Sequence, residues 1–88
     1  MRVKVNGRYW NLRFIDMDAL GDCDPPEAKQ KRIHIATDLD PKTELETTIH
    51  ELMHAAAWPA SEEYIETVSN DIANVLWRLG YRKANNGS

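Results

Sequence analysis

The spacing of apolar residues changes once along this chain and divides it into a strand-forming half and a helix-forming half. Up to Ala36, apolar and polar residues alternate in short runs, which is the period-two pattern of half-buried β-strands. From Pro41 onward, apolar residues recur every three or four positions, which is the period of an amphipathic helix. Strands followed by helices are typical of α+β domains.

The first two strands are expected to form a hairpin. Asn6-Gly7 separates the runs Val3 to Val5 and Tyr9 to Ile15, and this dipeptide readily adopts the positive φ angles of a type I′ turn. A third strand is expected from Lys31 to Ala36. Between them, residues 16–30 contain two prolines and four aspartates, a composition typical of a surface loop. The residues expected to face the core are Trp10, Leu12, Phe14, Ile33 and Ile35, whereas Arg32 and His34 face outward.

Two helices with recognisable ends follow. The first is expected over about Pro41–Ala57, with either Asp40 or Thr43 as its N-cap. It ends at Trp58-Pro59 because the residue before a proline disfavours helical dihedral angles. A second run of helical spacing extends from Ser61 to Gly80, a serine that can cap a helix and a glycine that can end one.

These patterns predict one α+β domain over residues 1–88, a small three-stranded sheet packed by two antiparallel helices. The net charge of −3 comes without a basic stripe, so nucleic acid is not an expected partner. No apolar run is long enough for a signal peptide or a membrane span. The single Cys23 cannot form an internal disulfide, and a cytoplasmic location is therefore expected.

The strongest functional signal is His50-Glu51-Leu52-Met53-His54, in the middle of the first expected helix. Residues four apart lie on the same side of a helix, so His50 and His54 can direct two imidazoles at one Zn²⁺ ion. Glu51 lies about 100° around the helix from His50, beside the ion, where its carboxylate can act as a general base. The alternative is a pair of surface histidines on an amphipathic helix.

A third ligand must come from elsewhere in the chain. Metzincins use a histidine six residues after the second one, but Ala60 occupies that position. The second helix offers three carboxylates. If both helices are counted from Pro59 at 1.5 Å per residue, Glu66 falls midway between the levels of the two histidines and is the predicted ligand. The carboxylates considered are Glu62, Glu63 and Glu66.

Asn70 lies one helical turn beyond Glu66 and near the level of His50. It is predicted to contact the ring of His50 without touching the metal, and so to fix the tautomer that binds. Glu62 and Glu63 are interpreted as carboxylates of a first helical turn, which are favourable there because of the helix dipole.

With these residues the chain resembles a gluzincin, the thermolysin-like class in which His-Glu-x-x-His is completed by a glutamate from the next helix. Glu66-Thr67-Val68-Ser69-Asn70 resembles the second motif of that class, a glutamate followed four residues later by an acidic or amide residue. The stretch from Lys31 to Tyr81 is also similar to short phage and prophage sequences assigned to metallopeptidases. The resemblance implies His50, His54 and Glu66 as ligands and Glu51 as the base. The two motifs lie closer together here than in thermolysin-like enzymes.

The sequence therefore predicts a zinc-dependent peptidase that hydrolyses a peptide bond in a protein or peptide substrate, with Glu51 as the general base. The strand Lys31 to Ala36 is the expected edge against which an extended substrate could lie. Two other interpretations stay open. One is a zinc-stabilised interaction domain without catalytic activity, and the other is a metal-free phage accessory protein.

Overall fold

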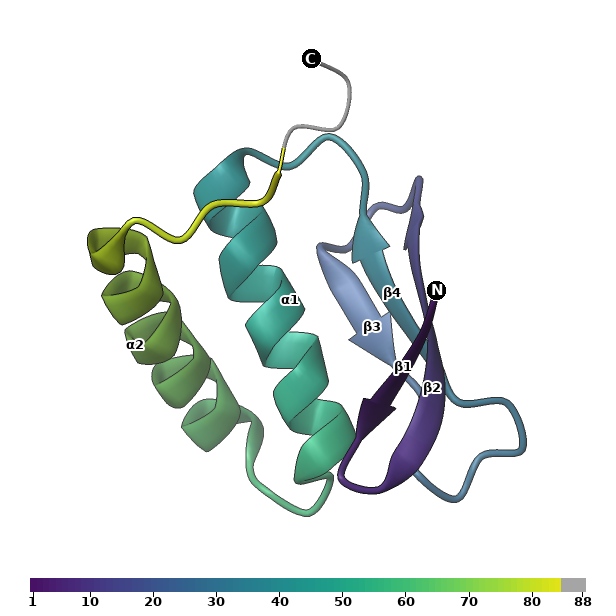
Figure 1. Ribbon diagram of the computed structural model, residues 1–88. Helices are drawn as coiled ribbons and strands as arrows, with labels where there is room; N and C mark the ends of the chain where they lie inside the picture. The colour runs from purple at the N-terminus through teal and green to yellow at the C-terminus, as the bar shows by residue number, and fades with distance from the viewer. Residues whose placement is uncertain (85–88) are drawn as a thin grey trace.

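The computed structural model describes residues 1–84 and contains a sheet followed by two helices (Figure 1). The hairpin, the strand expected after residue 30 and both helices occur within a few residues of their predicted positions, and the α+β class is confirmed. The elements are β1 (Arg2–Val5), β2 (Arg8–Ile15), β3 (Gly21–Cys23), β4 (Arg32–Ala36), α1 (Pro41–Ala56) and α2 (Glu62–Leu79).

The sheet has four strands in the order β1-β2-β4-β3, so the prediction of three strands is wrong by one. β1 pairs with β2 and β3 pairs with β4 in antiparallel fashion, whereas β2 and β4 are parallel. The extra strand, β3, lies inside the expected loop. Its three residues are too few for an alternating pattern, and pairing with β4 holds them in place. At its ends Ala36 N donates to the Leu20 carbonyl at 2.7 Å and Asp24 N to the Arg32 carbonyl at 2.9 Å.

The turn between β1 and β2 has the backbone conformation that its sequence indicates. Asn6 and Gly7 have φ angles of 50° and 76°, and positive φ at both central residues is what a type I′ turn requires. The Asn6 side-chain amide donates to the carbonyl of Ala56 at 3.1 Å. The hairpin is thereby tied to the end of α1.

The core lies between the sheet and α1. All the side chains expected to face it are buried except Phe14, which is 40% exposed. The ring of Phe14 lies near the end of β2 and is partly covered by the Lys83 ammonium group, 4.1 Å from the ring centroid. The buried cluster consists of Trp10, Leu12, Ile33, Ile35 and Ala55.

The two helices are antiparallel but form successive layers (Figure 1). α1 packs against β1, β3 and β4, whereas α2 contacts α1 and none of the strands. The expectation that both helices pack the sheet is therefore only half right. α2 buries the single row Ile65, Ser69 and Ala73, and a row so narrow suffices for one neighbouring helix. No helix among the described residues combines the length and apolarity needed to cross a membrane.

The helix ends follow the predicted signals. Asp40, the first of the two candidate caps, accepts a hydrogen bond from Thr43 N at 3.1 Å. Ser61 accepts one from Tyr64 N at 3.1 Å, and Gly80 ends α2 with a φ of 96°. These caps fix where each helix begins, and so which side chains of α1 and α2 meet.

Candidate metal centre

The two histidines of the motif meet on the side of α1 that faces α2 and β3. Their Nε2 atoms lie 3.1 Å apart, and their side chains are 17% and 16% exposed. One helical turn separates His50 from His54, as the sequence predicts. The pair thus presents two nitrogen donors at the rim of a cleft.

Glu62, the first residue of α2, completes the group. Its two carboxylate oxygens lie 2.9 Å from His50 Nε2 and 2.9 Å from His54 Nε2. A tetrahedral ion with bonds of about 2.0–2.1 Å separates its ligand atoms by about 3.3 Å. The three separations are somewhat shorter than this, and each histidine faces a different oxygen of Glu62, so the side chains must move slightly apart to admit an ion. We call His50, His54 and Glu62 the donor triangle. Two imidazoles and a carboxylate are a donor set that suits Zn²⁺.

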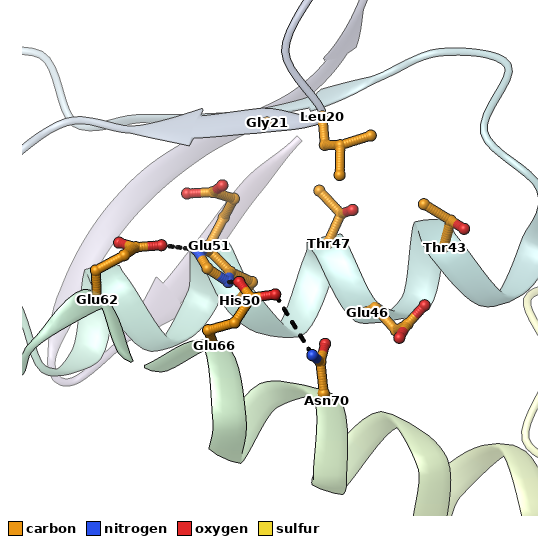
Figure 2. Close-up of a pocket in the computed structure, with 10 residues that line it drawn as sticks. All are labelled: Leu20, Gly21, Thr43, Glu46, Thr47, His50, Glu51, Glu62, Glu66 and Asn70. Carbon is orange, nitrogen blue, oxygen red and sulfur yellow. Dashed lines mark hydrogen bonds and ion pairs between the residues drawn. The ribbon is translucent and has the colours of Figure 1, made fainter. Parts of the chain in front are cut away.

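The geometry does not bring Glu66 into this group. Glu66 Oε2 lies 3.3 Å from Nδ1 of His50, the nitrogen on the other side of the ring. Asn70 lies one step further out and donates to Glu66 Oε1 at 3.4 Å (Figure 2). Glu66 thus takes the place beside the His50 ring that is predicted for Asn70, and Asn70 contacts Glu66 instead.

Glu66 is level with the two histidines only if both helices rise from Pro59. Residues 57–61 lie outside both helices, so a rise of 1.5 Å per residue does not apply there. The sequence did contain a signal for the alternative pair. Glu62 and Glu66 are also a glutamate followed four residues later by an acidic residue, and this pair fits the second motif as well as Glu66 and Asn70 do.

Glu51 lies between α1 and β3 and is only 6% exposed. Burial disfavours its charged form and raises the pKa of the carboxyl group to about 7, and the nearby carboxylates of Asp22 and Glu62 add to the shift. A carboxyl group that can hold a proton near neutral pH suits a general acid and base. Glu51 lines both hollows of the cleft together with His50 and Glu62.

Gly21 allows β3 to lie directly over this part of α1. A Cβ atom at Gly21 would be 2.7 Å from the His34 carbonyl oxygen, 3.0 Å from Thr47 Cγ2 and 3.1 Å from Glu51 Cγ. Only glycine fits so close to its neighbours. The absence of a side chain at this position is therefore what lets a strand cover Glu51.

The cleft consists of two hollows that share Gly21, His50, Glu51 and Glu62. One has a volume of about 400 Å³ and extends along α1 toward its N-terminus (Figure 2). The other, of about 330 Å³, extends toward Trp58 and Cys23. Burial and the neighbouring carboxylate of Glu51 raise the pKa of the Cys23 thiol to about 12, so this group stays protonated.

The donor triangle, the buried Glu51 and the overlying strand together form a site that could hold a metal ion with one side open to the cleft. Searches of protein-family models, curated proteins and solved structures give no match to the chain.

Proposed function

We propose that the protein is a zinc-dependent peptidase, and the observation that carries this proposal is the buried Glu51 carboxyl group beside a three-donor site. A structural zinc site is normally closed by four protein ligands. Here three donors converge and the remaining side opens into the cleft. A site that only stabilised the fold would have no use for a buried carboxyl group next to it.

The side chains have separate tasks in this proposal. His50, His54 and Glu62 hold the ion, which when bound polarises a carbonyl group and acidifies water. Glu51 accepts the proton of the attacking water and delivers it to the leaving amine as the carbon–nitrogen bond breaks. Burial prepares Glu51 for both steps, because it brings the pKa of the carboxyl group to about 7.

β3 is the strand against which an extended substrate would lie. The strand ending at Ala36, β4, is expected in this role from the sequence, but it is paired on both sides by β2 and β3. β3 is at the edge of the sheet and borders both hollows through Gly21. Backbone groups on its free edge can pair with a peptide, as in other cases of β-strand addition.

The decisive experiment compares wild type with Glu51→Gln. Both proteins are loaded with zinc and incubated with a broad peptide library, and mass spectrometry identifies new termini. We expect cleavage by wild type alone, because glutamine keeps the shape of the side chain but cannot carry the proton. Zinc content and circular dichroism of the two proteins should agree, which would exclude loss of metal or fold as the cause.

The alternative is a zinc-stabilised interaction domain, for which the donor triangle alone is sufficient. Zinc-loaded wild type that binds the ion stoichiometrically but cleaves nothing would favour it. Equal cleavage by wild type and Glu51→Gln would instead indicate a contaminating enzyme or a different mechanism. A folded protein that binds no zinc after reconstitution would contradict both metal-dependent functions.

A further inference from the structure

The larger hollow contains side chains that the proposed chemistry does not use. It extends from the donor triangle along α1 to Leu20, Thr43, Glu46 and Thr47 (Figure 2). Glu46 precedes His50 by four residues and therefore lies in the same row of α1, one turn or about 6 Å away. We call these four residues the Glu46 subsite.

We propose that the Glu46 subsite binds a lysine or arginine side chain of the substrate, next to the peptide bond that is cleaved. This inference rests on the peptidase function proposed above. Adjacent residues of an extended peptide are about 3.4 Å apart, and a basic side chain is long enough to span the remaining distance from the donor triangle to the Glu46 carboxylate. The Glu46 carboxylate would thus set the specificity at this position.

The charges of the cleft favour a cation. Glu46 is half-buried, and it forms no ion pair with any residue in the described part of the chain. Neither hollow is lined by a lysine or an arginine among residues 1–84. A bound divalent ion would not reverse the sign, because four carboxylates line the larger hollow. These are Glu46, Glu51, Glu62 and Glu66.

The other walls of the subsite fit the rest of a basic side chain. Leu20 and the methyl group of Thr47 lie on the β3 side (Figure 2), where an aliphatic stem could pack. Thr47 is a polar side chain that is only 5% exposed, yet it borders the hollow and forms no hydrogen bond with another described residue. Its hydroxyl group can accept a hydrogen bond from an ammonium or guanidinium group. Thr43 donates to Asp40 at 2.7 Å and keeps its oxygen free to accept another.

Binding to the zinc-loaded Glu51→Gln protein tests the subsite independently of cleavage. The probes are fluorescent peptides that differ at one position, which holds lysine, norleucine or glutamate. We expect the lysine peptide to bind about tenfold more tightly than the norleucine peptide, as a partly exposed charge-assisted hydrogen bond allows. Adding Glu46→Gln should abolish the preference, and adding Glu46→Lys should shift it to the glutamate peptide.

Asp71→Asn is the matched control, because it removes the same charge from α2 at a position that lines neither hollow. Equal binding of the lysine and norleucine peptides, no binding of any peptide, or the same loss of preference with Asp71→Asn would overturn the subsite. If wild type cleaves peptides but shows no preference for a basic residue, the subsite proposal is wrong and the peptidase proposal still stands. If the Glu51→Gln protein prefers the lysine peptide but wild type cleaves nothing, the peptidase proposal is wrong and the subsite remains as a binding site for a basic side chain.

Discussion

At the scale of single residues, the two ring nitrogens of His50 have different partners. Nε2 lies 3.1 Å from His54 Nε2 and 2.9 Å from Glu62, whereas Nδ1 lies 3.3 Å from Glu66. A carboxylate at Nδ1 favours the tautomer with its proton there, and the lone pair of Nε2 is then available for a metal. Asn70 donates to Glu66 and helps to hold it. The geometry thus distinguishes the Glu62 carboxylate, which could bind a metal together with the two histidines, from the Glu66 carboxylate, which contacts only the other side of the His50 ring.

This separation predicts a ranking of variants in zinc affinity. Glu62→Gln removes a ligand, whereas Glu66→Gln removes only the orienting partner of His50, a change that typically costs about 10–100-fold in affinity. We therefore expect Glu62→Gln to weaken zinc binding more than Glu66→Gln. Glu63→Gln, an exposed neighbour on the same turn, should leave it unchanged. Competition with a chromogenic chelator measures all three, and a larger loss for Glu66→Gln would restore the ligand set that the sequence predicts.

The local part of the site was predictable and the tertiary part was not. His50, Glu51 and His54 lie on one helix, and their relative directions follow from its period. Glu62 reaches them across a helix-to-helix connection, whose path depends on packing and not on spacing. The burial of Glu51 likewise depends on β3, because its carboxyl group would otherwise face open solvent on a lone α1.

At the scale of elements, β3 is the strand that local sequence patterns do not predict. The hairpin and both helices carry turn or cap residues with a local mechanism, and each forms where it is expected. Gly21–Cys23 has neither a period nor a propensity for strands, and it is a strand because the free edge of β4 accepts it. The layer position of α2 is equally non-local, since an apolar stripe does not say which neighbour will cover it.

Gly21→Ala tests whether this strand holds Glu51 in place. The added Cβ meets backbone at the His34 carbonyl, 2.7 Å away, so β3 must shift, at a cost of about 1–3 kcal/mol. We expect a lower urea midpoint together with shifted NMR signals from Glu51 and Thr47. Gly7→Ala is the control, because it has a strained φ of 76° but nothing within 4 Å. It should lower stability without moving those signals, and an unchanged Glu51 signal in Gly21→Ala would contradict the role of β3.

At the scale of the whole molecule, the buried carboxyl group of Glu51 is expected to lower the stability of the metal-free protein. Glu51 occupies a core-facing position of α1, where a charged group lacks the hydration that it has in the unfolded chain. The neighbouring carboxylates of Asp22 and Glu62 oppose its ionisation further. A bound cation would relieve this repulsion. The metal-free protein should therefore be less stable at neutral pH, because it keeps Glu51 in the buried position that the proposed chemistry needs.

The last prediction measures this penalty as a pH dependence of folding. In metal-free protein the pKa of Glu51 is raised from 4.5 to about 7, so the folded state binds more protons than the unfolded state between these values. Stability must then fall as pH rises through that window, by up to about 3 kcal/mol from this group, and stay low above it. The glutamine side chain of Glu51→Gln does not titrate, so this variant lacks the pH-dependent loss of stability that Glu51 causes.

We expect urea unfolding in the presence of a chelator to show the Gln variant gaining stability relative to wild type between pH 4.5 and 7. Other groups titrate in both proteins, so the difference between the two curves isolates Glu51. Parallel curves would mean that the carboxyl group is hydrated in the folded state. With zinc present the gain should shrink, because a nearby divalent cation favours the charged form of wild-type Glu51 and lowers its pKa.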